Sequence, residues 1–525
     1  MVNSELVHRR RWHILVVICI ALMVTTLDTT ILVVAVPRIV EDIHASGSQL
    51  QWMIDSYTIV FACLLLAAGA LGDRYGRRGA LIGGIVWFGA FSLIASMSNT
   101  PMQLIVTRAL LGAGGAFIFP TTLSLLTNVF TEPRERTRAI GVWAGFSGVG
   151  IAVGPPFGGI LVEHLGWHSV FWINVPICLV TAVAAAVVIP KMDHESERPL
   201  DPVGALISIV AMVGLLYAII EAPNGWSSRG VVLGFAEGIL GLVLFAWWER
   251  RAAHPMLDVV LFRNARFSAA SAALVLMTFA MYASTFLMTL YFQFTLGYSP
   301  VKTGLMMTPV AIGMMAASPQ AAGLAERFGT KAVATGSAMV LAVCIAIYGS
   351  DLIMSSLTFG VLTRFLYGVG LGLSGPVLTE SIMGSLPRDR AGVGSAVNDT
   401  TRQVGGALGV AVLGSVFAAR YHQVIDHAAG IPDAVRHQAR ESIGTTLRLA
   451  ATTPDRALAT RLREAGIDAF HSSMHLTYAL GAIIMASTIY IVWRYLPDSE
   501  HDPDATIVEI VSEPPLAAVI DGDRG

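Results

Sequence analysis

The chain has 525 residues, of which 54% are hydrophobic and 13% are charged. Soluble domains carry roughly 25% charged residues. Because apolar segments recur from end to end, this composition excludes a soluble protein with one anchor and indicates a polytopic membrane protein. The formal net charge of −2, without any basic tract, gives no reason to expect a nucleic-acid partner.

Apolar runs of about 20 residues, the length that crosses a bilayer, predict about fourteen transmembrane helices. In chain order they are 13–36, 50–71, 79–98, 102–128, 138–162, 169–190, 203–221, 230–249, 267–294, 303–325, 331–350, 356–385, 394–420 and 474–496. The first run follows three arginines, as a signal sequence would, but it is too long and no small-residue cleavage site follows it. We therefore expect it to be retained as the first helix.

Cationic side chains gather in alternate short loops, beginning with Arg9 to Arg11 before the first predicted helix. By the positive-inside rule, both termini then lie in the cytoplasm. The long connection 421–473 falls on the outside, and long loops are exempt from the rule. Its pattern from Pro432 to Glu464 predicts two short helices packed as a hairpin. The acidic, proline-containing tail after Pro497 is expected to be disordered.

Two segments of the chain are repeated at nearly the same offset. Residues 70–78 (ALGDRYGRR) have an echo in 323–331 (GLAERFGTK), and 107–112 (TRALLG) have one in 363–368 (TRFLYG). Repeated halves around a central cavity are a common build of secondary transporters. The predicted organisation is a cytoplasmic N-terminus 1–12, a six-helix bundle 13–190, a linker with two extra helices 191–266, a second six-helix bundle 267–496 and a tail 497–525.

Asp28 lies in the middle of the first apolar run. A charge at such depth costs roughly 2.5–3.5 kcal/mol, so it is usually paired, protonated or functional. The alternative is an aspartate that caps a helix break together with the neighbouring threonines. Asp55 and Arg108 lie near the outer ends of the second and fourth predicted helices. At 1.5 Å per residue, all three groups sit roughly 8–12 Å below the outer surface and could meet.

An arginine favours the ionised form of a nearby carboxyl group, whereas burial favours the neutral form. Moving Arg108 away from Asp28 would therefore let Asp28 bind a proton. We predict a proton-coupling site formed by Asp28, Asp55 and Arg108. The alternatives are that Asp55 is merely wet at the interface and that Arg108 pairs with backbone carbonyls.

Two further segments suggest moving parts. The loop Gly69–Leu81 has glycines that permit a tight turn, and Asp73 can accept hydrogen bonds or pair with an arginine, while Arg74, Arg77 and Arg78 face the anionic leaflet. Alternatively, the loop only sets topology. In the fifth predicted helix, the glycines between 145 and 159 form a flat packing face that Pro155-Pro156 bends.

These segments resemble the motifs of the major facilitator superfamily. The loop 69–81 resembles its signature, and 27–37 is similar to the first-helix motif of its fourteen-helix drug:proton antiporter branch. Residues 107–114 resemble its fourth-helix arginine motif, with Leu111 where a glutamine is common. Similar branch patterns occur at 145–159, 167–176 and 402–406, so the resemblance covers nearly the whole chain.

The resemblance implies an all-α membrane protein with two pseudo-symmetric six-helix bundles and two inserted helices. It further implies a proton-coupled efflux antiporter in the cytoplasmic membrane that exports amphipathic, often cationic, compounds by alternating access. No cofactor would be needed beyond the proton gradient, and the partners would be a small-molecule substrate, protons and lipid, with the protein as a monomer. The gating residues would be Asp73, Arg74, Gly76, Arg77, Gly154, Pro155, Gly158 and Gly159.

Substrate contacts are sought among deep acidic and aromatic side chains. Glu380 could pair with a cationic substrate or serve as a second proton site, or it could pair with Arg402 or a backbone group. Asp399 and Arg402, three residues apart, could satisfy each other on one helix face. Candidate cavity-lining residues, which could instead pack or face lipid, are Phe117, Phe146, Tyr282, Phe286 and Tyr291.

Other functions have less support in the sequence. A dedicated exporter of one metabolite, such as a lipid, siderophore or self-made antibiotic, would use the same machinery. A non-transporting membrane sensor has no supporting feature. We do not expect an enzyme or an ATP-driven pump, because no His-Glu-x-x-His pattern, clustered metal ligands or phosphate-binding Gly-x-x-x-x-Gly-Lys-Ser/Thr loop occurs. The four cysteines lie singly in apolar runs.

Overall fold

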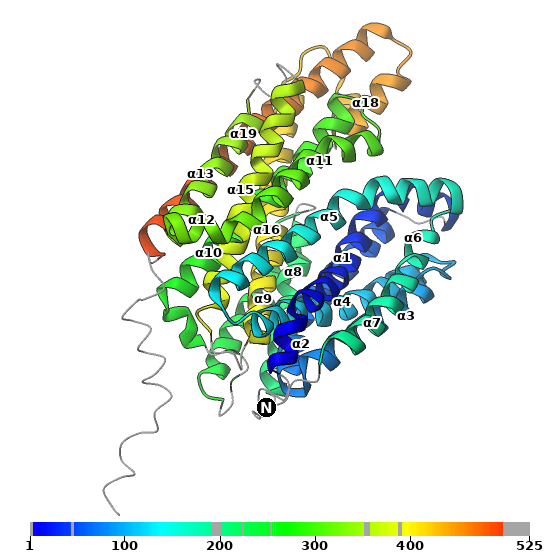
Figure 1. The fold of residues 1–525 in the computed structure, drawn as a ribbon. Coiled ribbons are helices and arrows are strands. Elements are labelled where there is room, and N and C mark those ends of the chain that lie inside the picture. The colour runs from blue at the N-terminus through cyan, green and yellow to red at the C-terminus, as the bar shows by residue number, and fades with distance from the viewer. Residues whose placement is uncertain are drawn as a thin grey trace, which may run out of the picture.

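The computed structural model describes residues 4–43, 47–190, 201–222, 225–252, 255, 257, 259–350, 357–386, 391–440 and 442–496. Within these ranges every regular element is a helix, so the predicted all-α fold class is confirmed. The predicted disorder of the tail after Pro497 lies outside the described residues. Figure 1 shows the helices as two groups that run from one end of the molecule to the other.

The first group and the inserted pair follow the chain closely. Their bounds are α1 Ser4–Ile43, α2 Gly47–Tyr75, α3 Arg77–Ala95, α4 Pro101–Val129, α5 Pro133–Leu165, α6 Ser169–Trp172, α7 Asn174–Val188, α8 Pro202–Glu221 and α9 Arg229–Glu249. Local signals set several of these ends. The Thr100 hydroxyl caps the start of α4, and Gly76 takes a φ of 101° between α2 and α3, a conformation that glycine adopts without strain.

The second group begins after a 3₁₀ turn, η2 (Val259–Arg263). Its bounds are α10 Ala265–Leu290, a short π-helix η3 Tyr291–Thr295, α11 Pro300–Ala317, a 3₁₀ turn η4 Ser318–Gln320, α12 Ala321–Phe328, α13 Thr330–Tyr348, α15 Leu357–Met383, α16 Ala391–Asp426, α17 Asp433–Ala439, α18 Ile443–Thr452 and α19 Arg456–Tyr495.

Twelve helices in the described ranges are long and apolar enough to cross a membrane. The two predicted spans outside this set are 138–162, which lies within α5, and 303–325, which is divided into α11, η4 and α12. Pro319 has no backbone N–H, and the chain tightens into η4 there. All fourteen predicted spans therefore coincide with helical segments, but the count of fourteen transmembrane helices is not exact.

Other predicted boundaries need correction. The run 169–190 consists of α6 and α7, and Ile173 between them keeps helical φ and ψ angles of −62° and −27°, so Ser169–Val188 forms one span. The outer connection does contain two short helices, α17 and α18, but the region from Arg456 onward belongs to α19, which starts eighteen residues earlier than the predicted span. The Asp455 side chain caps this start, and α18 packs against α19, so a polar stretch continues the helix beyond the apolar run.

Both groups pack in the same way. In the first, α2 packs on α4, α1 on α5 and α3 on α7; in the second, α11 packs on α15, α10 on α16 and α13 on α19. The echoed segments TRALLG and TRFLYG explain the α2–α4 contact and its counterpart, the α11–α15 contact. A Cβ atom at Gly112 would overlap the Tyr57 carbonyl of α2, and one at Gly368 would overlap the Val310 carbonyl of α11. The last glycine of each echo thus permits the same close helix crossing.

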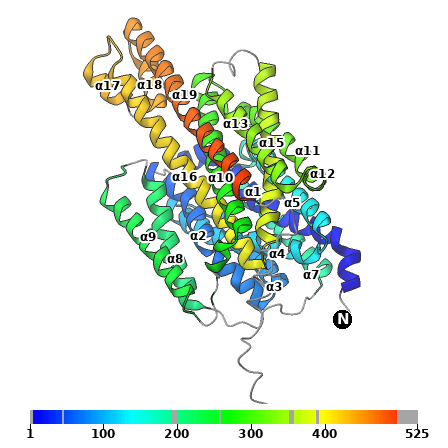
Figure 2. The ribbon, with the colours of Figure 1, turned by 90° about the vertical axis from the view of Figure 1, so that its left-hand side faces the viewer.

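The α8–α9 pair packs against α2 and α16, outside both groups, as Figure 2 shows. The two groups meet where α5 contacts α11 and α15 and where α16 contacts α2 and α4. We call the end that holds the Gly76 turn, the start of α5 and the Gly329 turn the arginine-rich end. The opposite end carries α17 and α18 (Figure 2).

Contacts between the groups along α5 lie near the arginine-rich end. Gly141 faces Ser318, whose carbonyl a Cβ would overlap, and Gly148 faces the Met314 side chain. Farther along, the glycines of α5 pack on α1 instead, as Gly150 does against Thr26. Helix α5 therefore joins the second group at one end and α1 at the other.

Candidate functional site

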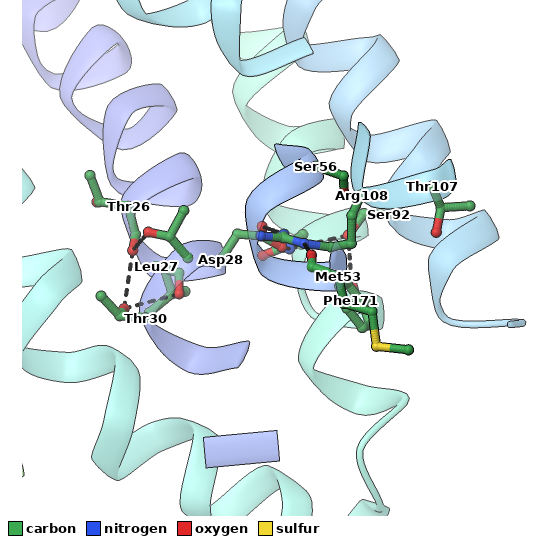
Figure 3. A network of polar contacts seen from close by, with 12 residues as sticks. Thr26, Leu27, Asp28, Thr30, Met53, Ser56, Ser92, Thr107, Arg108 and Phe171 are labelled. Atoms are coloured by element: carbon green, nitrogen blue, oxygen red, sulfur yellow. Dashed lines mark hydrogen bonds and ion pairs between the residues drawn. The ribbon is translucent and has the colours of Figure 1, made fainter. Parts of the chain in front are cut away.

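Asp28 is completely buried at the centre of the first group, on α1. Its Oδ2 accepts a hydrogen bond from Arg108 Nη1 of α4 at 2.5 Å, and its Oδ1 accepts one from Asn174 Nδ2 of α7 at 2.9 Å. Figure 3 shows the Arg108 side chain reaching across to Asp28. Because both carboxylate oxygens have donors and one donor is charged, the site suits the ionised form of Asp28.

Arg108 is itself fixed by α2. Its Nε donates to the Met53 carbonyl at 3.2 Å, and its guanidinium lies 4.4 Å from the centroid of the Tyr57 ring. Only 2% of the Arg108 surface is exposed. Leu111 packs in the core, so the polar support that a glutamine could have supplied there comes from the Met53 carbonyl and the Tyr57 ring.

Asn174 is a member of this site that the sequence did not single out. It lies at the start of α7, directly after Ile173, and is fully buried. Its Nδ2 also lies 3.1 Å from Ser92 Oγ, which donates to the Phe171 carbonyl at 2.8 Å. Its position inside an apolar run could have singled it out, because a buried amide side chain needs hydrogen-bond partners.

The other prediction about Asp28, that it caps a helix break, is wrong. Helix α1 runs without interruption from Ser4 to Ile43, and the neighbouring threonines satisfy their hydroxyls on carbonyls one turn back in the same helix. Thr30 also donates to the Gly150 carbonyl of α5 at 3.2 Å, which ties α1 to α5 one half-turn beyond Asp28.

Asp55 is half-buried on α2, two residues from both Met53 and Tyr57. The contacts to the Asp28–Arg108 pair described above come from Met53, Tyr57 and Asn174. The predicted role of Asp55 as the third residue of the coupling site therefore stays a prediction.

The loop at the arginine-rich end holds a buried ion pair. Arg77 Nε lies 2.9 Å from Asp73 Oδ1, and both side chains are largely buried. Arg77 therefore does not face the leaflet as expected; of the two pairing modes open to Asp73, the structure shows the one with an arginine. Arg74 lies over the ring of Tyr75 at 5.8 Å. Gly76 forms the turn between the end of α2 at Tyr75 and the start of α3 at Arg77.

The glycines expected to gate in α5 lie against α1. A Cβ at Gly154 would overlap the Thr30 hydroxyl, and one at Gly158 would overlap the Ile31 side chain. Gly159 is half-buried, and α5 continues through Pro155 to Leu165. These glycines therefore set the contact between α5 and the helix that carries Asp28.

Glu380 joins the two groups of helices. It is 6% exposed on α15, and Arg136 of α5 binds it in a bidentate manner, with Nε 3.0 and 2.9 Å from the two carboxylate oxygens and Nη2 on Oε1. Its ion partner is thus not Arg402. A second pair, Arg134 with Glu326 of α12 at 3.2 Å, crosses the same boundary at the exposed surface.

A small cavity lies between the groups, with a volume of about 40 Å³. Its lining includes Trp143, Met281, Met314, Thr379 and Arg402. A drug-sized ligand needs roughly 300–1,000 Å³, whereas a single water needs about 10–15 Å³. In this conformation the cavity can therefore hold water but no drug.

The five aromatic candidates are not among the residues that line this cavity. Tyr291 is buried, Phe117 and Phe146 are half-buried, and Tyr282 and Phe286 are exposed. A Cβ at Gly406 of α16 would touch the Tyr282 ring. Their role as substrate contacts stays a prediction for another conformation.

Comparison with known proteins decides the family. The family model described as Major Facilitator Superfamily matches residues 18–410. The chain belongs to the Major Facilitator Superfamily. It is therefore a multi-pass membrane protein of a transporter family, and the Asp28 site lies within one of its membrane-spanning helix bundles.

Several relatives within the superfamily have names that describe efflux or resistance. The chain is 33% identical over 486 residues to the multidrug efflux pump LfrA of Mycolicibacterium smegmatis, covering 92% of this chain and 96% of that protein. It is 31% identical over 512 residues to the tetracenomycin C resistance and export protein of Streptomyces glaucescens, covering 94% of each. It is 33% identical over 448 residues to the methyl viologen resistance protein SmvA of Salmonella typhimurium, covering 85% of this chain and 90% of that protein.

Among solved structures, the human organic anion transporter MFSD10 (TETRAN) superposes with a TM-score of 0.60 at 13% identity. The match covers 92% of this chain and 99% of that chain. At this identity the likeness supports the fold of the Major Facilitator Superfamily and nothing finer.

Proposed function

We propose that this protein is a proton-coupled antiporter that exports amphipathic, often cationic, compounds across the cytoplasmic membrane. The names of its relatives, which describe multidrug efflux and resistance to single toxic compounds, support the substrate class. The observation that carries the proton coupling is the buried Asp28–Arg108 pair. In this proposal the protein works as a monomer in lipid, with both termini in the cytoplasm and the proton gradient as its energy source.

The coupling step follows from the cost of burying charge. While Arg108 binds Asp28, the carboxylate is neutralised without a proton. A buried carboxylate that loses its partner costs several kcal/mol, and taking up a proton removes that cost. A movement of α1 relative to α4 would therefore exchange the guanidinium for a proton on Asp28.

Helix α5 offers the mechanical connection. At the arginine-rich end, Arg136 and Gly141 hold it to α15 and η4 of the second bundle. Farther along, it receives the Thr30 hydrogen bond from α1. A rocking of the second bundle can thus be passed to the helix that carries Asp28, because helices transmit displacement as rigid elements.

The positive-inside rule makes the arginine-rich end cytoplasmic. In this proposal the ion pairs Arg136–Glu380 and Arg134–Glu326 close the cytoplasmic side of an outward-facing conformation, in which Arg108 neutralises the Asp28 carboxylate. A proton arriving from the outside would displace Arg108 from Asp28 and start the return to the inward-facing state.

Inverted membrane vesicles test this proposal. Wild-type protein should take up ethidium when an inward-acid pH gradient is imposed and should stop when the gradient is collapsed. Asp28→Asn keeps the size of the side chain but cannot ionise, so gradient-driven uptake should fall to the level of empty vesicles at equal membrane abundance. Undiminished uptake by this variant would refute Asp28 as the coupling site.

A dedicated exporter of one metabolite is the second candidate, because some relatives are named for a single compound. One is the puromycin resistance protein of Streptomyces alboniger, which is 34% identical over 78% of this chain. A susceptibility panel of chemically unrelated cationic and neutral compounds separates the two candidates. Protection against one scaffold only would favour the dedicated exporter, and protection against several would favour multidrug efflux.

A further inference from the structure

A second carboxyl group is buried in the other bundle, on α16. Asp399 is 3% exposed, and its Oδ1 accepts a hydrogen bond from Asn398 Nδ2 at 3.2 Å. Its Oδ2 is buried and has no hydrogen-bond partner among the described residues. The expected pair with Arg402 does not form, since no ion pair within 4 Å joins the two side chains in the described part of the chain.

This environment contrasts with that of Asp28. Both oxygens of Asp28 have donors, and one donor is a guanidinium, whereas within the described ranges Asp399 has one amide donor and one oxygen without any. An ionised carboxylate with an unsatisfied oxygen is costly inside a protein. A carboxyl group that carries a proton on that oxygen avoids the cost.

The cluster around Asp399 reaches the cavity between the bundles. Asn398 Oδ1 accepts a hydrogen bond from Thr379 Oγ1 at 3.2 Å, and Thr379 lines the cavity. Arg402, one turn along α16, lines it as well. Because the cavity holds only about 40 Å³, what can reach this cluster in the present conformation is water and protons and not a drug-sized cation.

Charged groups near this carboxyl group come from α16 itself and from the helices packed on it. Helices α2, α4, α8, α10, α15 and α19 pack against α16, and among the described residues Arg402, one turn along α16, is the cation whose charge acts on Asp399. Asp73 of α2 and Glu380 of α15 are each held by an arginine, Arg77 and Arg136 respectively. They therefore compete little for Arg402.

We propose that Asp399 is a second proton-carrying carboxyl group of the transporter, serving the cavity between the bundles. Asp399 does not itself line the closed cavity, so the exchange takes place as the cavity opens: Oδ2 takes a proton from a hydronium ion, leaving water, and later returns it to water. Trp143, which lines the cavity, lies two turns along α5 from Arg136, so separation of the Arg136–Glu380 pair would open the cavity toward the arginine-rich end. This inference rests on the proposed proton-coupled function, and it adds a proton site in the second bundle.

Infrared difference spectroscopy on the full-length protein in liposomes tests the proposal without a substrate. A change of pH reports each buried carboxyl group that gains a proton as a C=O stretching component that shifts in D₂O. Asp28→Asn and Asp399→Asn should each remove a separate component, and the double variant should remove both. Asp468→Asn, which changes an exposed acid on α19, is the matched control and should keep both components.

The outcomes separate the two proposals. A wild-type spectrum in Asp399→Asn, with a component lost in Asp28→Asn, would overturn the second site alone. No difference between Asp28→Asn and wild type would overturn the proposed coupling site. If Asp399→Asn is not recovered from membranes, Asp399→Glu should show the C=O component of residue 399 at a shifted frequency. If that component is missing in Asp399→Glu, Asp399 is a structural aspartate and the proposal is overturned.

Discussion

Replacing Glu380 with glutamine tests how the two bundles are held together at the arginine-rich end. The side chains of Arg136 and Glu380 are 16% and 8% exposed, so the pair is only weakly screened by solvent. Hydrogen bonds to charged groups contribute about 1.5–3 kcal/mol, and neutral ones about 0.5–1.5 kcal/mol. Because the amide keeps part of the bidentate contact, we expect the closed conformation to lose about 1.5–2.5 kcal/mol relative to the open one.

A loss of this size changes the ratio of closed to open molecules by roughly 10- to 70-fold, since 1.4 kcal/mol corresponds to a factor of ten. Spin labels on Tyr75→Cys and Phe328→Cys report the ratio, because both positions are exposed at the arginine-rich end on different bundles. The four native cysteines are buried. The distance distribution of the Glu380→Gln protein should move toward longer separations.

Glu326→Gln is the matched control. The side chains of Arg134 and Glu326 are 67% and 44% exposed, and exposed pairs contribute at most about 1 kcal/mol, so the distance distribution should change by less than about five-fold in population. The exchange Arg136→Glu with Glu380→Arg should restore the closed state. An unchanged distribution in Glu380→Gln, or equal effects of both single variants, would refute the reasoning.

Three further predictions concern packing, the Asp28 site and substrate charge. Gly112→Ala places a Cβ on the Tyr57 carbonyl and should cost about 1–3 kcal/mol, seen as a lower melting temperature in detergent, whereas Gly83→Ala, where a Cβ meets nothing within 4 Å, should not lower it; equal melting temperatures would contradict the close crossing. Asn174→Ala should lower the free energy of unfolding by about 1–3 kcal/mol, because an Asp28 oxygen loses its donor, and by less in an Asp28→Asn background. If the losses in this double-mutant cycle are additive, the Asn174–Asp28 contact does not contribute to stability. Because Arg136 occupies Glu380 in the closed state, Glu380→Gln should impair export of neutral and cationic compounds to a similar degree, and a loss confined to cations would instead favour the substrate-binding role expected from the sequence.

Much of the fold and part of the site could be predicted from the sequence because they depend on position along one helix. Apolar length gives the spans, and the rise of 1.5 Å per residue gives the depth of a charge. Asp28 and Arg108 were predicted to share a depth, and they are in contact. The echoed TRxLxG segments predicted two related halves, and their glycines make equivalent crossings.

The tertiary structure decided which side chains at one depth actually meet. Rotation about each helix axis and the choice of neighbouring helix depend on packing across the whole bundle, which no local pattern encodes. Glu380 therefore pairs with Arg136, 244 positions away, and not with Arg402, while Asp399 lacks the partner one turn along its own helix. Asn174, at the start of α7, reaches Asp28 of α1 across 146 positions of the chain, because these two helices pack side by side.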